Sequence, residues 1–332
     1  MHPRQVLLGA QAGAVVLPVC DHYSGVEARM RKSLQLQAQY IQRTGACVFD
    51  VTLDCEDGAP VGGEAEHALL VTELLQGLDL SGAVPPRVGV RVHPVDHRAF
   101  EADLDQLLGQ AAGKISHLMV PKVESVQDVE RAATLADAAG GAQVPLHVLI
   151  ESPLAVHRAF DIAAHPRVQS LSFGLMDFVS AHGGAIPSTG MGVQGQFNHP
   201  LVVRAKLEIA SACHAHGKVP SHCVVTEFKD PLALKLAATR AAQELGYSRM
   251  WSIHPDQIEP ILEAFSPAAD EVEKACEIVL AAFEAQWAPI SHRGHLHDRA
   301  SYRYFWQVLE RAHQTGCALP ANIQVFFASN PM

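Results

Sequence analysis

The chain lacks the cysteine patterns that hold small secreted domains or zinc sites together. Its seven cysteines are scattered through 332 residues, and none belongs to a C-x-x-C pair. An odd number without such pairs argues against a disulfide framework and against a structural zinc site. We therefore expect reduced thiols and a cytoplasmic protein.

Positive charge and long apolar runs are also scarce. Lys and Arg number 25 against 35 Asp and Glu, a formal net charge of -10, which excludes a broad attraction to nucleic acid or to an anionic membrane. Every apolar stretch is broken long before the roughly 20 residues that span a bilayer. The sequence contains neither an H-E-x-x-H zinc motif nor a G-x-x-x-x-G-K-[ST] nucleotide loop. The apolar start is interpreted as leading into a strand, not as a secretory signal.

What the chain has is hydrophobic residues, 48% of the total, arranged in short Val-, Ile- and Leu-rich runs that alternate with segments of helical periodicity. This pattern is typical of parallel strands joined by crossover helices. The runs are AVVLPVC (to Cys20), CVFDVTLDC (to Cys55), RVGVRVHP (to Pro94), ISHLMVPKV (to Val123), PLHVLIES (to Ser152), VQSLSFGLMDF (to Phe178), KVPSHCVV (to Val225) and RMWSIHP (to Pro255). Eight runs in order predict a closed barrel.

We therefore predict an α/β fold, a (β/α)8 TIM barrel over residues 1–265, with a C-terminal helical extension or lid over residues 266–332. Ser24 is a candidate cap for the first crossover helix, and Asp230 followed by Pro231 is a typical helix start. Within the extension, the stretch SHRGHLHD is expected to be a polar loop between two helices.

Charged residues follow several of the apolar runs. Active sites of such barrels are assembled at the carboxyl ends of the strands, so these side chains are predicted to face one cavity. They are Asp54, Glu56 and Asp57 after the second run, Arg91 in the third, Lys122 after the fourth, Glu151 after the fifth and Asp177 after the sixth.

Glu151 and Asp177 are candidate ligands of Mg²⁺, which prefers hard oxygen donors and retains positions for water and substrate. The planar fork of Arg91 suits a substrate carboxylate. The alternative is that each charge merely ends a strand in solvent. Four successive strand ends carrying such groups favour function, because a buried charge costs several kcal/mol unless it is paired or bound to metal.

These motifs resemble a known family. LDCEDGAP, VRVHP, MVPKVES, LIESPLAV, FGLMDF and SIHPDQIEPI look like the strand-end motifs of the HpcH/HpaI aldolase and citrate lyase β-subunit family, which includes malyl-CoA lyases. The likeness covers about Cys20 to Pro260. It implies a carbon–carbon lyase that binds Mg²⁺ through Glu151 and Asp177 and holds a substrate carboxylate with Arg91.

The resemblance also implies roles for the other charged residues. Asp54, Glu56 and Asp57 would line the site and position metal-bound water. We group Lys122, Asp54 and Glu56 with Arg91 as substrate-binding residues, and we group Asp57 with Arg91 among the catalytic ones. The alternative for Asp57 is helix capping.

The segment GHLHDRASYRYFWQVL resembles the part of the family that closes over a barrel, often that of a neighbouring subunit. Asp298 matches its acid–base aspartate, and either Asp298 or a water would protonate the enolate left after cleavage. The alternative is that Asp298 caps the last helix.

The chain also departs from the family pattern. It has GAVVLPVCDHYSG where members carry an arginine before the first strand and a VPG-like motif after it. An anion contact is then missing, or it is supplied by one of four basic residues, Arg4, Arg29, Arg31 or Lys32. Among the histidines, His22 and His182 are the candidates for substrate contact, whereas His254 is interpreted as part of a structural turn.

The predicted function is Mg²⁺-dependent aldol- or Claisen-type cleavage or condensation of a small oxo or hydroxy acid, as a coenzyme A (CoA) thioester or free. Two alternatives stay open: a CoA-independent pyruvate-type aldolase, and a catalytically inactive metal-binding barrel that serves as scaffold or sensor. We expect a homo-oligomer, a trimer or hexamer.

Overall fold

The structure is a computed structural model that describes residues 2–13 and 16–328. The chain divides into two compact units. One is Pro18–Ala264, and the other combines Met1–Leu17 with Phe265–Met332. The first seventeen residues thus belong with the C-terminal helices, whereas the sequence prediction counted them with the barrel.

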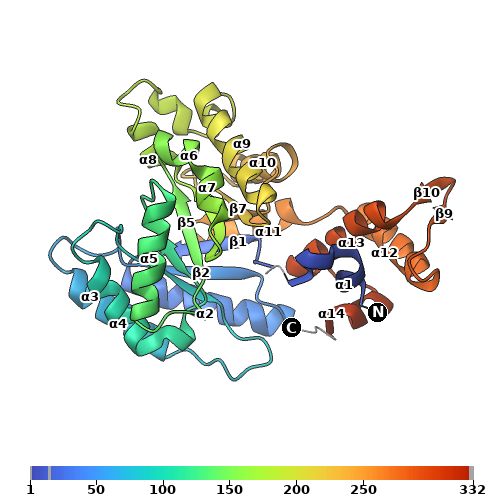
Figure 1. Ribbon diagram of the computed structural model, residues 1–332, viewed down its shortest axis with the longest axis horizontal. Coiled ribbons are helices and arrows are strands. Elements are labelled where there is room, and N and C mark those ends of the chain that lie inside the picture. The colour runs from blue at the N-terminus through green and yellow to red at the C-terminus, as the bar shows by residue number, and fades with distance from the viewer. Residues whose placement is uncertain (1, 14–15, 329–332) are drawn as a thin grey trace. The chain divides into compact units, whose positions relative to one another are not determined.

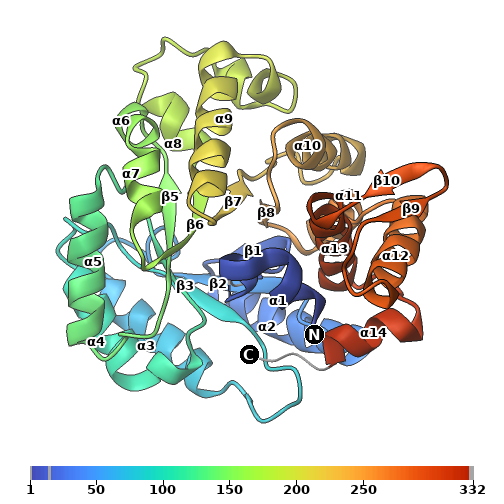
Figure 2. The same ribbon diagram turned by 45° about the vertical axis from the view of Figure 1, so that its right-hand side comes forward.

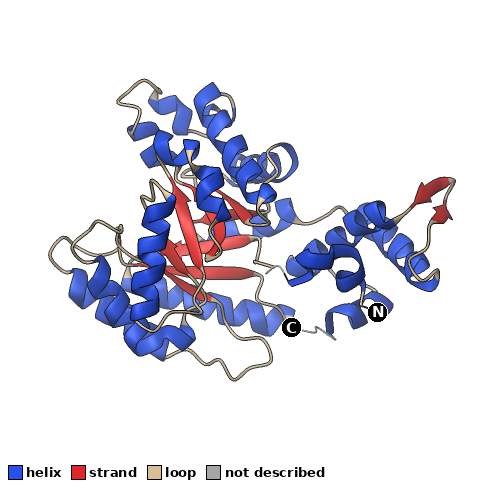
Figure 3. Cartoon of the chain, viewed as in Figure 1, coloured by secondary structure: helices blue, strands red, loops and turns tan. Residues whose placement is uncertain are grey.

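The larger unit is a closed barrel of eight parallel strands in the order β1 to β8, surrounded by helices (Figure 1, Figure 3). This confirms the predicted (β/α)8 fold. The strands are β1 (Cys20–Ser24), β2 (Phe49–Asp54), β3 (Val88–Arg91), β4 (Leu118–Val120), β5 (Leu146–Ile150), β6 (Val168–Phe173), β7 (Val219–His222) and β8 (Arg249–Ser252). All eight fall within or directly beside the runs found in the sequence.

The first strand lies later than predicted. It begins at Cys20, where the predicted run ended, and it pairs with Phe49 on β2 and with Met250 on β8. Pro18 has no N–H to donate to a ladder, which helps to explain why pairing starts beyond it. Ser24 is therefore the last residue of β1, and it does not cap the following helix, whose N-cap is Val26 without a side-chain bond.

Helices occupy every connection between the strands. They are α2 (Glu27–Thr44), α3 (Glu64–Gln76), α4 (Phe100–Ala111), α5 (Val126–Ala138), α6 (Pro153–His157), α7 (Ala159–Ala164), α8 (Leu175–Ser180), α9 (Pro200–Ala215) and α10 (Pro231–Glu244), followed by α11 (Ile258–Phe265). Asp230 caps α10 as predicted, because its side chain accepts the N–H groups of Leu232 and Ala233. Short 3₁₀ turns are η2 (Ala112–Lys114), η3 (Ser188–Met191), η4 (Gly195–Phe197) and η5 (Pro255–Gln257).

The smaller unit has a core of its own. Its elements are α1 (Pro3–Leu8), η1 (Gly9–Gly13), α12 (Ala269–Glu284), β9 (Ile290–His292), β10 (His295–His297), α13 (Arg299–Gln314) and α14 (Ala321–Ala328). Leu7 of α1 packs in one cluster with Ile278 of α12 and Trp306 of α13. Figure 2 shows these helices and the hairpin in orange, red and dark blue.

The predicted polar loop is in fact a β-hairpin, β9 paired antiparallel with β10. Arg293 and Gly294 join the strands with φ angles of 49° and 82°. Positive φ at both central residues is what a tight type I′ hairpin turn needs. The sequence did not indicate this turn, because arginine is an unusual residue at a position with positive φ.

The barrel interior changes character along its axis. Near the amino ends of the strands lies a buried ionic layer, in which Arg249 contacts Asp21 at 2.9 Å and Asp50 at 2.7 Å. Nearer the carboxyl ends Met119, Leu149 and Trp251 form an apolar cluster. Within residues 2–13 and 16–328, no helix combines the length and apolarity needed to cross a bilayer.

Candidate active site

Arg91 is the centre of a charged cluster at the carboxyl end of β2 and β3. Its guanidinium is buried and donates to both oxygens of Asp54 at 2.7 and 2.9 Å. The same group donates to Asp57 at 2.7 Å and to the hydroxyl of Tyr23 at 2.6 Å, and it lies 3.1 Å from Glu56. The predicted residues do come together, but Arg91 is held by three carboxylates instead of standing open for a substrate.

The attraction between the Arg91 guanidinium and the neighbouring carboxylates stabilises this cluster. Burial disfavours the charged form of Arg91, yet the hydrogen bond and the charge of Asp54 raise its pKa well above the usual value. Burial also raises the pKa of Glu56, against the opposing effect of Arg91. Asp57 does not cap a helix, because α3 begins later, after an N-cap at Gly63; it binds Arg91 instead.

Glu151 lies directly after β5 and is buried, with 7% of its surface exposed. The backbone N–H of Lys122 donates to its carboxylate at 2.7 Å. Lys122 has a φ of 53°, a left-handed conformation that costs a non-glycine residue of order 1 kcal/mol or more and is often found at functional sites. The strained residue thus places its own N–H on Glu151, while its ammonium group contacts Glu56 at 2.7 Å.

Glu151 also needs the glycine that follows β6. A Cβ atom on Gly174 would lie 2.5 Å from both Cβ and Oε2 of Glu151, so the carboxylate occupies the space a side chain would fill. Burial and the nearby charge of Asp177 raise the pKa of Glu151 to about 7. A buried carboxyl group with a raised pKa beside a second carboxylate is a typical functional feature.

Asp177 is not at the end of a strand as predicted. It is exposed in the first turn of α8, which starts at Leu175 directly after β6. The sequence run VQSLSFGLMDF reads as one apolar segment, but Gly174 divides it into strand and helix. Glu151 and Asp177 supply the oxygen donors that Mg²⁺ prefers, and the raised pKa of Glu151 is evidence that the pair would gain from a cation.

A second group of possible metal ligands lies deep in the barrel. Ligand atoms of Asp21, His117 and His147 are within 4.8 Å of one another, and all three residues are buried. The two imidazole rings are stacked 3.9 Å apart at 14°, so their in-plane lone pairs do not converge. Asp21 already accepts from Thr52 at 2.7 Å and contacts Arg249. We interpret this group as a polar packing layer, because nitrogen ligands are not what Mg²⁺ selects.

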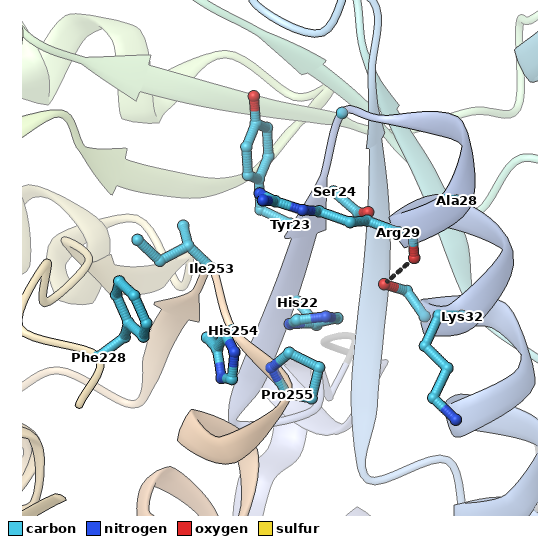
Figure 4. A pocket seen from close by; sticks show the side chains of 12 residues that line it. His22, Tyr23, Ser24, Ala28, Arg29, Lys32, Phe228, Ile253, His254 and Pro255 are labelled. Atoms are coloured by element: carbon cyan, nitrogen blue, oxygen red, sulfur yellow. Dashed lines mark hydrogen bonds between the residues drawn. The ribbon is translucent and has the colours of Figure 1, made fainter.

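A cavity of about 600 Å³ opens between β1 with α2 and the segment after β8 (Figure 4). Arg29 and Lys32 of α2 line one wall, and Phe228 and His254 line the other. Tyr23 belongs both to this cavity and to the Arg91 cluster. Of the four predicted anion contacts, Arg29 and Lys32 therefore lie at the barrel mouth, while Arg31 pairs with Glu27 on the surface and Arg4 lies in the smaller unit.

The three singled-out histidines have different surroundings. His22 lines the cavity and bonds Ser252 at 2.7 Å, and burial lowers its pKa to about 4. His182 bonds the carbonyl of Phe178 in its own helical turn at 2.7 Å. The ring Nδ1 of His254 accepts from the backbone N–H of Asp256 in a capping box, which agrees with the predicted structural turn.

Asp298 of the smaller unit is the N-cap of α13. Its Oδ1 accepts from the N–H groups of Ala300 at 3.0 Å and Ser301 at 3.4 Å, so capping employs one carboxylate oxygen. Asp298 also borders a surface hollow beside Gln286 and Trp287, which have φ angles of 53° and 67°. The cap that was the alternative interpretation is present, and the catalytic role of Asp298 stays a prediction.

The fold and the charged cluster at its carboxyl end define a TIM-barrel enzyme. The sequence profile of the HpcH/HpaI aldolase/citrate lyase family matches residues 35–255, and the chain belongs to that family. Its class of activity is carbon–carbon lyase.

Named relatives and solved structures agree with this placement. An L-malyl-CoA/beta-methylmalyl-CoA lyase of Cereibacter sphaeroides is 30% identical over 293 residues, which cover 82% of this chain and 90% of that protein. A citrate lyase structure from Burkholderia xenovorans is 48% identical with a TM-score of 0.79, covering 98% and 99% of the two chains. The CitE protein of Mycobacterium tuberculosis, solved with magnesium, acetoacetate and coenzyme A, shares the fold at 21% identity, with a TM-score of 0.68 and coverage of 90% and 99%.

Two functional candidates were missed by sequence reasoning. Tyr23 was overlooked because the predicted first strand ended before it, so no signal placed it beside Arg91. Gly174 was overlooked because it sits inside an apolar run, although an isolated glycine in a strand pattern often marks close approach of another group.

Proposed function

We propose that this protein catalyses the Mg²⁺-dependent cleavage or formation of a carbon–carbon bond in a small hydroxy or oxo acid carried as a CoA thioester. The observation that carries the proposal is the pair Glu151 and Asp177, a buried carboxylate directly after β5 and an exposed one in the first turn of α8, with the pKa of Glu151 raised to about 7. Bound Mg²⁺ would act as a Lewis acid on the carbonyl oxygen of the acid.

Glu151 and Asp177 are the residues that would hold the metal. The N–H of Lys122 fixes one oxygen of Glu151, which orients the carboxylate as a partner outside the coordination sphere does in many metal sites. Lys122 and Arg91 both contact Glu56, so this residue links the metal-binding side of the site to the arginine.

Arg91 is proposed to bind the carboxylate of the acid. Asp54 holds the Nε edge and one Nη of the guanidinium, which leaves the Nη1 group near Glu56 as the donor that a substrate would meet. A carboxylate arriving there would take the place of Glu56 and would bring a strong charge-assisted bond. Asp57, largely exposed, is proposed to release Arg91 in the same step.

Asp298 is proposed as the acid that protonates the enolate, presented by the C-terminal unit acting as a lid. We further propose a homo-oligomer, a trimer or hexamer, in which the lid acts within a subunit or on a neighbour. All seven cysteines are free, which supports a cytoplasmic location.

The cavity between β1 and β8 supports the thioester reading over the CoA-independent aldolase. Arg29 and Lys32 give it positive charge, and a CoA ester carries phosphates that a free oxo acid lacks. Its volume of about 600 Å³ exceeds what a three- or four-carbon acid fills. The names of the relatives in Cereibacter sphaeroides include CoA thioesters, which favours the same choice.

The test combines thermal shift and turnover. We expect Mg²⁺ with glyoxylate, oxaloacetate or pyruvate to raise Tm, since a ligand of the native state stabilises it, and acetyl-CoA or propionyl-CoA to add to the shift. Arg29→Ala with Lys32→Ala should remove the CoA increment, whereas Arg31→Ala, on the exposed face, should keep it. A shift with oxo acids alone would indicate the aldolase, and binding without turnover would indicate a scaffold or sensor.

A further inference from the structure

Two residues beyond Arg91, a buried histidine is held by a buried carboxylate. The backbone N–H of His93 donates to Oδ2 of Asp103 on α4 at 3.0 Å, and the ring Nδ1 of His93 lies 2.6 Å from the same oxygen. The two residues are 4% and 2% exposed. The ring of His97 stacks on that of His93, with centroids 4.5 Å apart and planes 11° apart. These contacts fix the orientation of the His93 ring.

The second ring nitrogen of His93, Nε2, is open. A carboxylate oxygen only accepts, so Nδ1 carries the proton that His93 shares with Asp103. Among the described residues no group bonds Nε2, and Nε2 is not one of the fully enclosed unpaired polar atoms. A histidine whose Nδ1–H rests on a carboxylate while Nε2 stays open has the arrangement of a proton-transfer residue.

His93 lies at the same edge of the barrel as Arg91. The N–H of Val92 donates to the carbonyl of Met119 at 3.1 Å, so the pairing with β4 continues past the last residue of β3. Side chains alternate along a strand, which places positions 91 and 93 on one face. His93 therefore belongs beside the charged cluster around Arg91.

The charged groups that act on His93 come from three elements. They are Asp103 on α4, Glu56 after β2 and Glu64 at the start of α3, while the ring of His97 faces it from its own loop. Burial by itself would lower the pKa of His93, but the hydrogen bond and charge of Asp103, followed by the charges of Glu56 and Glu64, raise it above the usual 6.5. His93 thus keeps its proton to a higher pH than an ordinary histidine.

Glu56 is the group that would need a proton when substrate binds. It lies 3.1 Å from Arg91 and 2.7 Å from Lys122, and burial raises its pKa. In the proposed function a substrate carboxylate takes the place of Glu56 on Arg91, so Glu56 loses one cation and gains a neighbouring anion. Both changes favour its protonated form.

Two cations near Glu56 have a proton to give. Lys122 is the weaker acid, because its hydrogen bond to Glu56 outweighs partial burial and raises its pKa above the usual 10.5. The imidazolium of His93 starts from a usual value of 6.5, so it gives up its proton first.

We propose that His93 is a positioning residue that donates a proton to Glu56 as the substrate carboxylate displaces Glu56 from Arg91. This inference rests on the proposed lyase function and adds a coupled proton transfer to it. The N–H bond at Nε2 of His93 breaks, an O–H bond forms on Glu56, and the electron pair stays on the imidazole. A cation and an anion become two neutral groups, while Asp103 holds the ring in place.

The first experiment counts protons. Pyruvate or oxaloacetate is titrated calorimetrically into protein saturated with Mg²⁺, so that Glu151 is already ionised, in buffers of small and large ionisation enthalpy. In wild type we expect no proton exchange with buffer while His93 is charged, and uptake of about one proton per bound acid above its pKa. His93→Gln should take up about one proton at every pH, and its affinity should fall about tenfold per pH unit where wild-type affinity is constant.

Asp103→Asn tests the pair without removing the imidazole. Loss of the carboxylate charge should lower the pKa of His93, so proton uptake should begin at a lower pH than in wild type. His157→Gln, at an exposed position of α6, is the control and should leave the proton count unchanged. A contact that only ties the β3 loop to α4 would change Tm in the His93 and Asp103 variants but not the proton count.

A measurement on wild type covers the case in which His93→Gln does not fold. In nitrogen NMR spectra, assigned with Asp103→Asn, the imidazole signals of His93 should change from the charged to the neutral form when oxo acid saturates the Mg²⁺-loaded protein. Binding of the acid with His93 still charged, or with equal proton counts in wild type and His93→Gln, would overturn this inference alone. Absence of binding by either oxo acid would overturn the lyase proposal itself.

Discussion

Gly174→Ala tests whether the placement of Glu151 matters independently of its charge. The new Cβ would lie 2.5 Å from Cβ and Oε2 of Glu151, a distance that real contacts do not reach. Gly174 has a φ of -92°, which alanine adopts freely, so the cost is packing and not backbone strain. Overpacking of this kind costs about 1–3 kcal/mol, and Tm should fall by roughly 2–4 °C per kcal/mol.

The functional effect should exceed the structural one. Displacing the carboxylate by about 1 Å is expected to lower kcat/KM by roughly 10²-fold and to weaken Mg²⁺ binding measured by calorimetry. Gly109→Ala is the control, because its Cβ meets nothing within 4 Å and a helical alanine adds up to about 1 kcal/mol of stability. Wild-type Mg²⁺ affinity and activity in a folded Gly174→Ala protein would refute the role given to Glu151.

Three further predictions follow from the same contacts. Arg91→Lys should raise the KM for the oxo acid more than it lowers kcat, because lysine cannot form the fork that grips a carboxylate; steady-state kinetics decides, and an unchanged KM would contradict the role. Asp298→Asn should lose turnover but keep its Tm, because asparagine also caps helices. Asp298→Ala should lose turnover and also about 0.5–2 kcal/mol of stability. Full activity in Asp298→Asn would show that Asp298 serves only as a helix cap. The pKa of Glu151 is raised from the ordinary 4.5 to about 7, so between these pH values the folded protein retains a proton that the unfolded chain loses. The contribution of Glu151 to metal-free stability should therefore fall as pH rises from about 4.5 to 7. Mg²⁺ affinity should rise over the same pH range, because the proton leaves the carboxylate that binds the metal. Glu151→Gln should abolish both trends in pH-dependent Tm and calorimetry, and persistence of either trend would assign it to another group.

Much of the barrel follows from local sequence signals. Eight apolar runs separated by helical segments predict a closed parallel barrel because strands buried on both faces need nearly continuous hydrophobic residues. The first strand was misplaced because AVVLPVC is more apolar than CDHYS, although CDHYS forms β1. The polar side chains of Asp21 and Tyr23 in this strand are stabilised by Arg249 and Arg91. These partners lie far along the chain, so a local sequence pattern does not reveal them.

The sequence predicts which residues form the site better than it predicts how they contact one another. Strand-end position brings together Asp54, Arg91 and Glu151 because parallel strands share one carboxyl edge. The extent to which Arg91 is occupied by acidic neighbours depends on side-chain distances that spacing does not encode. The left-handed conformation of Lys122 was equally hidden, since nothing in PKVES distinguishes a strained lysine from an ordinary one.

A calorimetric Mg²⁺ titration of wild type, Glu151→Gln and Asp177→Asn decides whether these two carboxylates hold the metal, with Asp161→Asn on the exposed face of α7 as control. We expect one site in wild type and in the control. In each carboxylate variant we expect a loss of affinity greater than the roughly 10–100-fold that removal of an outer partner causes. Magnesium binding that is unchanged in both variants would rule out Glu151 and Asp177 as the ligands.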